Sequence, residues 1–154
     1  MKVVLFAGPV CAGKTTIARC LADYIPGAIQ ASFSDGLRML AKNDNISLLN
    51  RSDFQDYGEK VAQYRWRELL DATRECVQAS SNQLLLLDGL RHPHILEHIR
   101  RFSVKSILIY VDPGPTVLQL RRRDNCEEHT SFYHASESHL SDLEAMSDLV
   151  IRGP

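Results

Sequence analysis

The stretch GPVCAGKTT at residues 8–16 constrains this chain more than any other part of the sequence. It follows the apolar run VVLFA and precedes IARCLADYI, whose apolar residues recur with helical spacing. A glycine, four residues and then Gly-Lys-Thr is the spacing of a P-loop, in which backbone N–H groups and a helix N-terminus surround phosphate oxygens. Because a strand before the loop and a helix after it are the context that this motif requires, the sequence predicts a nucleotide-binding loop rather than an ordinary turn. The residues expected to bind the nucleotide are Gly8, Pro9, Val10, Cys11, Ala12, Gly13, Lys14, Thr15 and Thr16.

Two residues, one in this loop and one far from it, predict a magnesium site. The hydroxyl of Thr15 is placed to hold Mg²⁺, while Lys14 would reach the β- and γ-phosphates. Asp88 ends the apolar run LLLL, where a Walker-B carboxylate would orient the metal. An acidic residue after a strand also commonly forms a turn, but the presence of the P-loop favours the metal role. Asp112 is the competing carboxylate, and the PGP that follows it indicates a turn and a helix start. ATP and Mg²⁺ are therefore the expected cofactors.

Strand-like and helix-like segments alternate along the chain. Apolar runs predict strands at 2–7, 28–33, 83–89, 104–112 and 148–151. Helical patterns occupy 16–24, 34–42, 52–79, 93–102, 115–123 and 138–146, and the length of the third allows a break near 64–67. Such alternation predicts an α/β fold with a parallel sheet, in which ligands bind beyond the carboxyl ends of the strands.

Length, charge and cysteine usage limit the class of protein. A chain of 154 residues suits a single domain. Basic and acidic side chains number 18 and 19, so no general positive field favours nucleic-acid binding. The sequence has no run of 18 apolar residues that would offer a membrane span, and its cysteines at 11, 20, 76 and 126 show no C-x-x-C pairing. Since a P-loop stands where a signal peptide would be cleaved, we expect a cytoplasmic protein with reduced thiols and neither a membrane nor a nucleic-acid partner.

Four segments together resemble the nucleoside monophosphate kinase family, whose relatives include adenylate kinases and dephospho-coenzyme A kinases. These segments are GPVCAGKTT, SDGLR at 34–38, LLLLDGLR at 84–91 and the arginine run 121–123, and the resemblance covers nearly the whole chain in the family's order of elements. It implies one three-layer P-loop kinase domain over 1–154, with a five-stranded parallel sheet in the order 2-3-1-4-5. It also implies an acceptor-binding region at about 34–70 and a short lid at about 121–139.

The resemblance assigns roles to four arginines. Arg38 and Arg91 match the family positions that hold the phosphate of the acceptor, and Arg121 and Arg123 are the nearest matches to the lid arginines that close on the transferred phosphoryl group. Phosphoryl transfer brings two polyanions together, so bidentate cations are needed on both sides. Each arginine taken singly is equally typical of a solvated surface charge. Their joint placement after strand ends favours the functional interpretation.

The activity that the resemblance implies is that of an ATP-dependent small-molecule kinase transferring the γ-phosphoryl group to a nucleoside or deoxynucleoside monophosphate. Two alternatives stay open. One is phosphorylation of an alcohol, as in dephospho-coenzyme A kinases, and the other is a nucleotide-binding module without turnover. Asp35 bears on the first, because its carboxylate could orient an acceptor hydroxyl or equally cap a helix. PGPT after the strand at 104–112, in place of N-K-x-D, disfavours a guanine-specific switch protein.

Histidines give two weaker patterns. His129, His134 and His139 follow Cys126 within the expected lid, where their spacing favours a polar flap over a zinc site. His94 and His98 lie one helical turn apart without a third ligand, so we expect both to face solvent.

Overall fold

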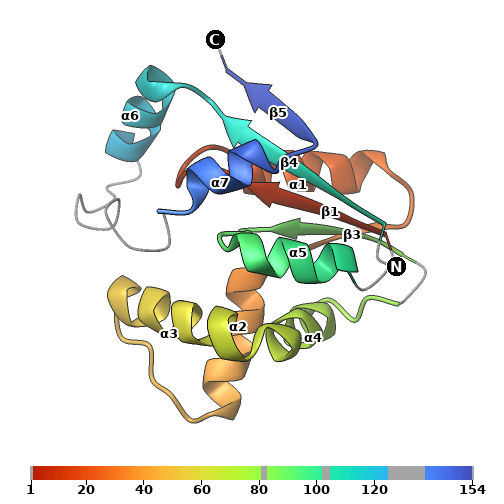
Figure 1. Ribbon diagram of the computed structural model, residues 1–154, viewed down its shortest axis with the longest axis vertical. Coiled ribbons are helices and arrows are strands. Elements are labelled where there is room, and N and C mark those ends of the chain that lie inside the picture. The colour runs from red at the N-terminus through yellow and green to blue at the C-terminus, as the bar shows by residue number, and fades with distance from the viewer. Residues whose placement is uncertain (1, 81–82, 102–104, 125–137, 154) are drawn as a thin grey trace.

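Five parallel strands form the central sheet, in the order β2-β3-β1-β4-β5 (Figure 1). This computed structural model describes residues 2–80, 83–101, 105–124 and 138–153. The strands are β1 (Lys2–Ala7), β2 (Ala28–Ser32), β3 (Leu84–Asp88), β4 (Lys105–Asp112) and β5 (Leu149–Arg152). The predicted α/β fold class, strand order included, is confirmed.

Helices connect these strands, and their limits refine the expected ones. They are α1 (Lys14–Tyr24), α2 (Phe33–Asn43), α3 (Arg51–Tyr64), α4 (Trp66–Cys76), α5 (Pro93–Arg101), α6 (Pro115–Asp124) and α7 (Leu140–Ala145). The long pattern at 52–79 breaks at Arg65, within the range expected for a break. Two helices begin one residue earlier than expected: Ser32 caps α2 through its hydroxyl, and Asn50 caps α3 in a capping box with Asp53.

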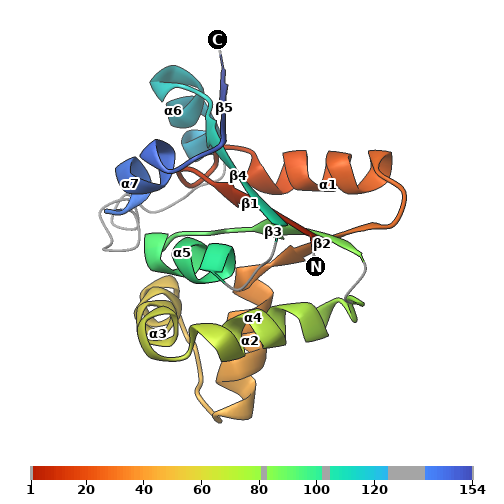
Figure 2. The same cartoon turned by 45° about the vertical axis from the view of Figure 1, so that its right-hand side comes forward.

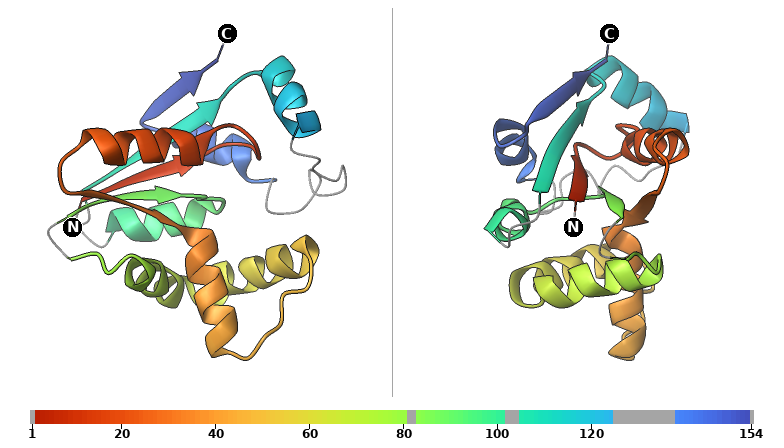
Figure 3. Two further views of the ribbon diagram at one scale, coloured as in Figure 1. Left: turned by 180° about the vertical axis from the view of Figure 1, so that it is seen from behind. Right: turned by 90° about the vertical axis from the view of Figure 1, so that its right-hand side faces the viewer.

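The sheet lies between two layers of helices, with α1 and α6 over one face and α5 and α7 over the other (Figure 3). Alternation along β1 explains this arrangement. Val3 and Leu5 point into the larger core that includes residues of α5, whereas Phe6 packs with Ala18 of α1 in a smaller core. Because successive side chains of a strand point to opposite faces, an apolar run such as β1 needs cover on both sides.

Three helices, α2 to α4, extend below the sheet as a group, in orange to yellow-green in Figures 1 and 2. The helices α2 and α4 approach closely because Gly36 has no side chain: a Cβ there would lie 2.2 Å from Oγ1 of Thr73 and 3.0 Å from its backbone nitrogen. The guanidinium of Arg65, at the break between α3 and α4, binds the carboxylate of Asp44 at the end of α2, with one N–O distance of 3.2 Å. The hydroxyl of Tyr57 donates to the same carboxylate at 2.7 Å. These contacts fix α2, α3 and α4 relative to one another.

Most of the expected lid at 121–139 falls outside the described residues, as do Cys126, His129 and His134. Only its ends, in α6 and just before α7, belong to the described part. Among the helices of the described ranges, none has both the length and the hydropathy that crossing a bilayer demands.

Candidate functional site

The loop between β1 and α1 has the geometry of an anion-binding turn. Gly8 adopts a φ of 136° and Gly13 a φ of 97°, values that favour glycine. A Cβ on Gly8 would lie 2.3 Å from the carbonyl oxygen of Val111, so this position requires glycine for space as well. The ammonium group of Lys14 folds back over the loop and donates to the carbonyl oxygens of Gly8 at 2.9 Å and Pro9 at 2.7 Å. The loop therefore has the form that its sequence pattern predicts.

Lys14 carries its charge in a buried position, with 9% of its surface exposed. Burial, reinforced by the positive charge of Arg91, lowers the pKa of Lys14 to about 8, while Asp88 and Cys11 oppose the shift. An ammonium group that is short of solvation gains more from an arriving phosphate than an exposed one does. Lys14 is thus suited to bind a polyanion at this loop.

Thr15 and Asp88 meet at the carboxyl end of the sheet. The hydroxyl of Thr15 donates a short hydrogen bond to Oδ2 of Asp88, a residue that is only 6% exposed. The other carboxylate oxygen of Asp88 is buried and has no hydrogen-bond partner within the described part of the chain. A hydroxyl and an unsatisfied carboxylate are the oxygen ligands that Mg²⁺ prefers, so these two residues fit the predicted magnesium site. Asp112, the competing carboxylate, instead accepts from the N–H of Gly114 at 3.0 Å and forms the expected turn.

A second cation lies over the P-loop. Arg121 donates from one guanidinium nitrogen to the carbonyl oxygens of Ala12 at 2.9 Å and Cys11 at 3.3 Å. Together with residues 11–17 it lines a hollow of about 470 Å³. Arg123 is exposed and lines neither this hollow nor the larger pocket described next. Of the two arginines predicted for the lid, the structure brings Arg121 to the nucleotide loop.

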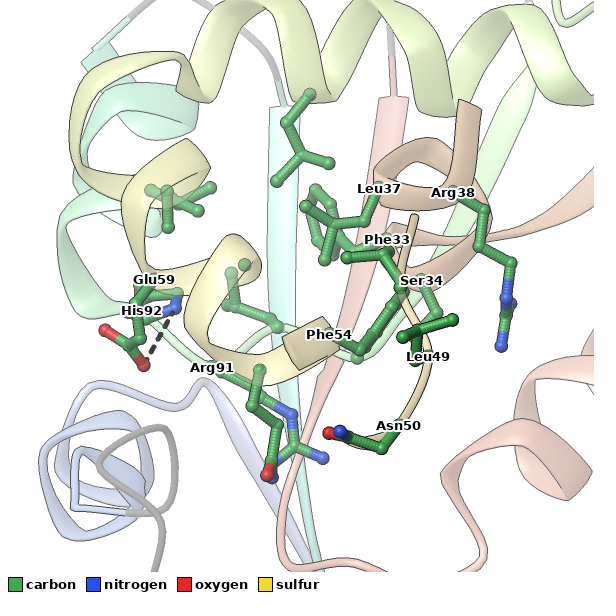
Figure 4. A pocket seen from close by; sticks show the side chains of 18 residues that line it. Phe33, Ser34, Leu37, Arg38, Leu49, Asn50, Phe54, Glu59, Arg91 and His92 are labelled. Carbon is green, nitrogen blue, oxygen red and sulfur yellow. Dashed lines mark ion pairs between the residues drawn. The ribbon is translucent and has the colours of Figure 1, made fainter. Parts of the chain in front are cut away.

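A larger pocket of about 700 Å³ opens between the sheet edge and the α2–α4 group (Figure 4). Its walls combine apolar with polar side chains, and Arg38 and Arg91 supply positive charge; these are the arginines predicted to bind the acceptor phosphate. The segment after β3 forms one side of the pocket, and it is held to the end of β1 because the N–H of Leu90 donates to the carbonyl oxygen of Phe6 at 3.1 Å. The lining residues are Phe33, Ser34, Leu37, Arg38, Leu48, Leu49, Asn50, Phe54, Gln55, Gly58, Glu59, Ala62, Leu69, Gly89, Leu90, Arg91, His92 and Ile95.

Asp35 stands apart from this pocket. It lies in the first turn of α2, is exposed, and pairs with Arg38 at 2.9 Å without lining the pocket. The side chain of Arg38 is 65% exposed and its guanidinium carbon lies 5.3 Å from the centre of the Phe54 ring. Asp35 therefore pairs with Arg38 in this structure and is absent from the lining of the pocket.

Sequence reasoning missed Glu59 and His92, which line the same pocket. They come from α3 and from the turn before α5, with Nε2 of His92 3.7 Å from Oε1 of Glu59. Burial lowers the pKa of His92 to about 4, and the neighbouring His94, His139 and Arg91 add to the effect, so the imidazole is neutral at pH 7. His92 directly follows Arg91, so the sequence places it next to a predicted site residue. The helical pattern of α3, by contrast, does not distinguish Glu59 from its neighbours as a site residue.

The expectation that His94 and His98 face solvent is wrong. Both are half-buried between α5 and the α3–α4 pair. Nε2 of His94 lies 2.7 Å from the carbonyl oxygen of Ala62, and the ring of His98 stacks on Trp66 with centroids 4.3 Å apart. No group of three or more metal-ligating side chains gathers among the described residues, so these histidines act in packing.

The comparisons with known proteins agree with this geometry. The family described as an AAA domain matches residues 4–142. No curated protein sequence matches the chain at a significant level. Shikimate kinase from Acinetobacter baumannii in complex with shikimate is similar in structure, with a TM-score of 0.60 and 18% identity over 100% of this chain and 84% of that one.

Two further solved structures have the same fold. Shikimate kinase from Aquifex aeolicus gives a TM-score of 0.57 at 13% identity, over 98% of this chain and 86% of that chain. The tunicamycin resistance protein of Deinococcus radiodurans gives a TM-score of 0.56 at 16% identity, over 99% of both chains. At identities this low, the structural likeness shows a shared fold and no more. This fold is the P-loop kinase fold that the sequence predicts.

Proposed function

The chain belongs to the AAA domain family, and from this premise we propose that it is an ATP-dependent small-molecule kinase. The γ-phosphoryl group of ATP would pass to a nucleoside or deoxynucleoside monophosphate. The protein is then a phosphotransferase with a small-molecule partner, and its P-loop is the donor site.

The observation that carries this proposal is the position of Arg91 between two sites. Arg91 lines the larger pocket, and after burial its charge is the next cause that lowers the pKa of Lys14 in the P-loop. A cation shared by a nucleotide loop and an apolar pocket suits a reaction in which two polyanions must meet in line. The aromatic walls of the pocket, Phe33 and Phe54, suit a planar ring attached to the acceptor phosphate.

Each charged residue has a role in the proposal. Lys14 and Arg121 neutralise the phosphates of ATP, and Arg38 and Arg91 hold the phosphate of the acceptor. Thr15 and Asp88 hold Mg²⁺, which would supply charge neutralisation at the phosphates. Because a phosphate oxygen is already a nucleophile, no general base is required. Arg123, which is exposed on α6 and lines neither pocket, stays a predicted lid arginine.

An alcohol acceptor is the second candidate, because one of the similar structures is a kinase in complex with shikimate. A hydroxyl must lose a proton during transfer, so such a reaction benefits from a carboxylate at the acceptor. The predicted candidate, Asp35, is exposed and paired with Arg38 outside the pocket lining. This placement favours the phosphate acceptor.

A coupled assay tests the proposal. ATP and Mg²⁺ are supplied with a panel of nucleoside and deoxynucleoside monophosphates, dephospho-coenzyme A and shikimate, and ADP formation is followed against a control without acceptor. We expect turnover with at least one monophosphate. Turnover with an alcohol alone would replace the first candidate by the second, and ATP binding without any transfer would support a nucleotide-binding module.

A further inference from the structure

The acceptor pocket has two chemically different sides. In Figure 4, Glu59 and His92 lie together on one side and Arg38 on the other, with Phe54 between them. The positive side suits a phosphate, and the apolar middle suits the face of a ring. The opposite side presents a carboxylate, a group that only accepts hydrogen bonds when ionised.

Glu59 is incompletely satisfied where it stands. Its Oε1 is buried and accepts no hydrogen bond within the described ranges of the chain, since Nε2 of His92 at 3.7 Å is too distant. The side chain keeps 30% of its surface exposed and lines the pocket, so a bound molecule can reach its exposed part, while Oε1 itself is covered. A partly buried carboxylate with one oxygen unpaired is weakly solvated, and a ligand that donates to the exposed part of the carboxylate compensates for this.

His92 does not neutralise this carboxylate. Only 11% of its side chain is exposed, and its low pKa keeps the imidazole uncharged at neutral pH. The pocket side next to Glu59 therefore has a carboxylate and a neutral ring rather than a closed ion pair, and the guanidinium of Arg91 is close enough to act on His92. Such a side attracts hydrogen-bond donors and repels carbonyl oxygens.

We propose that Glu59 selects the acceptor by accepting hydrogen bonds from N–H groups on the ring of the acceptor. The pocket then prefers a base with an exocyclic amino group over the same base with a carbonyl or a hydrogen at that position. This inference rests on the proposed monophosphate kinase activity and adds the substrate class. A carboxylate that accepts from a donor on the bound ring disfavours an analogue that lacks the donor, because the carboxylate then exchanges water for a group that gives it no hydrogen bond.

Matched pairs of monophosphates test the inference. GMP differs from IMP by one amino group, and CMP differs from UMP by an amino group in place of a carbonyl and by the missing proton on N3; both transfer and binding by calorimetry are measured for the four. We expect the amino-bearing member of the better pair to have a kcat/KM at least about tenfold higher. Glu59→Gln should reduce this ratio to about threefold or less, mainly through KM, since an amide can offer a donor where the carboxylate offers only acceptors.

Glu97→Gln, an exposed change on α5 outside the pocket, is the matched control and should keep the wild-type ratio. Circular dichroism melting shows whether Glu59→Gln is folded, and Glu59→Ala gives a second variant if it is not. An unchanged ratio in folded Glu59 variants, or no discrimination by the wild type, overturns the inference while transfer itself still supports the kinase. If Glu59→Gln abolishes kcat at unchanged KM, Glu59 is a base and not a selector. If none of the four nucleotides binds, the inference fails, and the wider panel of monophosphates decides the kinase proposal separately.

Discussion

The hydroxyl of Thr15 donates a hydrogen bond to the carboxylate of Asp88, a residue 73 positions further along the chain. Thr15 lies at the start of α1 and Asp88 at the end of β3, and the parallel pairing of β1 with β3 places Asp88 beside Phe6, just before the P-loop. Neighbouring strands of a parallel sheet end at the same edge, so their last residues meet even when the sequence separates them widely. The contact brings the two predicted magnesium ligands together.

Replacing Asp88 by asparagine should therefore impair the use of Mg²⁺. We expect Asp88→Asn to fold and to lower kcat by about a hundredfold or more, because a neutral amide is a poor ligand for a hard cation. Transfer rates measured over a range of Mg²⁺ concentrations check this. Asp112→Asn is the matched control, since Asp112 serves a turn at the end of β4. If the transfer rates of both variants depend on the Mg²⁺ concentration in the same way, Asp88 is not a ligand of the metal.

Lys14→Met should abolish transfer, by at least about a thousandfold, because it removes the buried charge over the P-loop. It should also change how stability depends on pH. The pKa of Lys14 is about 8 in the folded chain against 10.5 for an ordinary lysine, so the unfolded chain binds more protons between these pH values. The free energy of unfolding of the wild type then rises with pH across this window, by roughly 2–3 kcal/mol more than that of the variant.

Chemical denaturation at pH 7.5, 9 and 10.5 measures this difference, and groups that titrate in both proteins cancel from it. If the free energies of unfolding of the two proteins change with pH in parallel, the folded structure does not lower the pKa of Lys14. The loss of transfer is a separate observation and would stand in either case.

Arg38→Ala should raise the KM of the acceptor at least about tenfold and leave the affinity for ATP unchanged, since Arg38 lines the larger pocket and not the hollow over the P-loop. Arg121→Ala should do the opposite and weaken ATP binding, because Arg121 lies over that loop. Calorimetry with ATP and steady-state kinetics separate the two effects. Arg19→Ala, an exposed change on α1, is the control. A loss of ATP affinity in Arg38→Ala would contradict the division of the site into two pockets.

Gly36→Ala should destabilise the fold, on the order of 1–3 kcal/mol, because the new methyl group would meet Thr73 at the crossing of α2 and α4. Gly58→Ala is a matched change in α3, where the added Cβ meets only the flexible end of Leu37 at 3.3 Å and alanine favours the helix. Urea denaturation should show a lower midpoint for the first variant and little loss for the second. Similar midpoints would show that α2 and α4 can separate without cost.

Features encoded in short stretches were predictable from the sequence. The P-loop, the strands and the break near Arg65 follow from local spacing and apolar runs, which depend on residues close together in the chain. Local spacing could not show that Arg38 lines the pocket while Asp35 does not. Both residues occupy one helical turn, and only the docking of α2 decides which of them lines the pocket. Glu59, His94 and His98 were misjudged or missed for the same reason: their surroundings come from other helices, which a helical pattern does not specify.

The hydrogen bond from Leu90 to Phe6 ties the segment after β3 to the strand that leads into the P-loop. Arg91 is the next residue, so backbone at the carboxyl end of the sheet sets the spacing between Arg91 and the P-loop. The helices that form the rest of the acceptor pocket, by contrast, are a single insertion between β2 and β3. Such an insertion can be replaced as a unit in evolution. A descendant with different α2 to α4 helices would have a different pocket beside the same P-loop and the same Arg91.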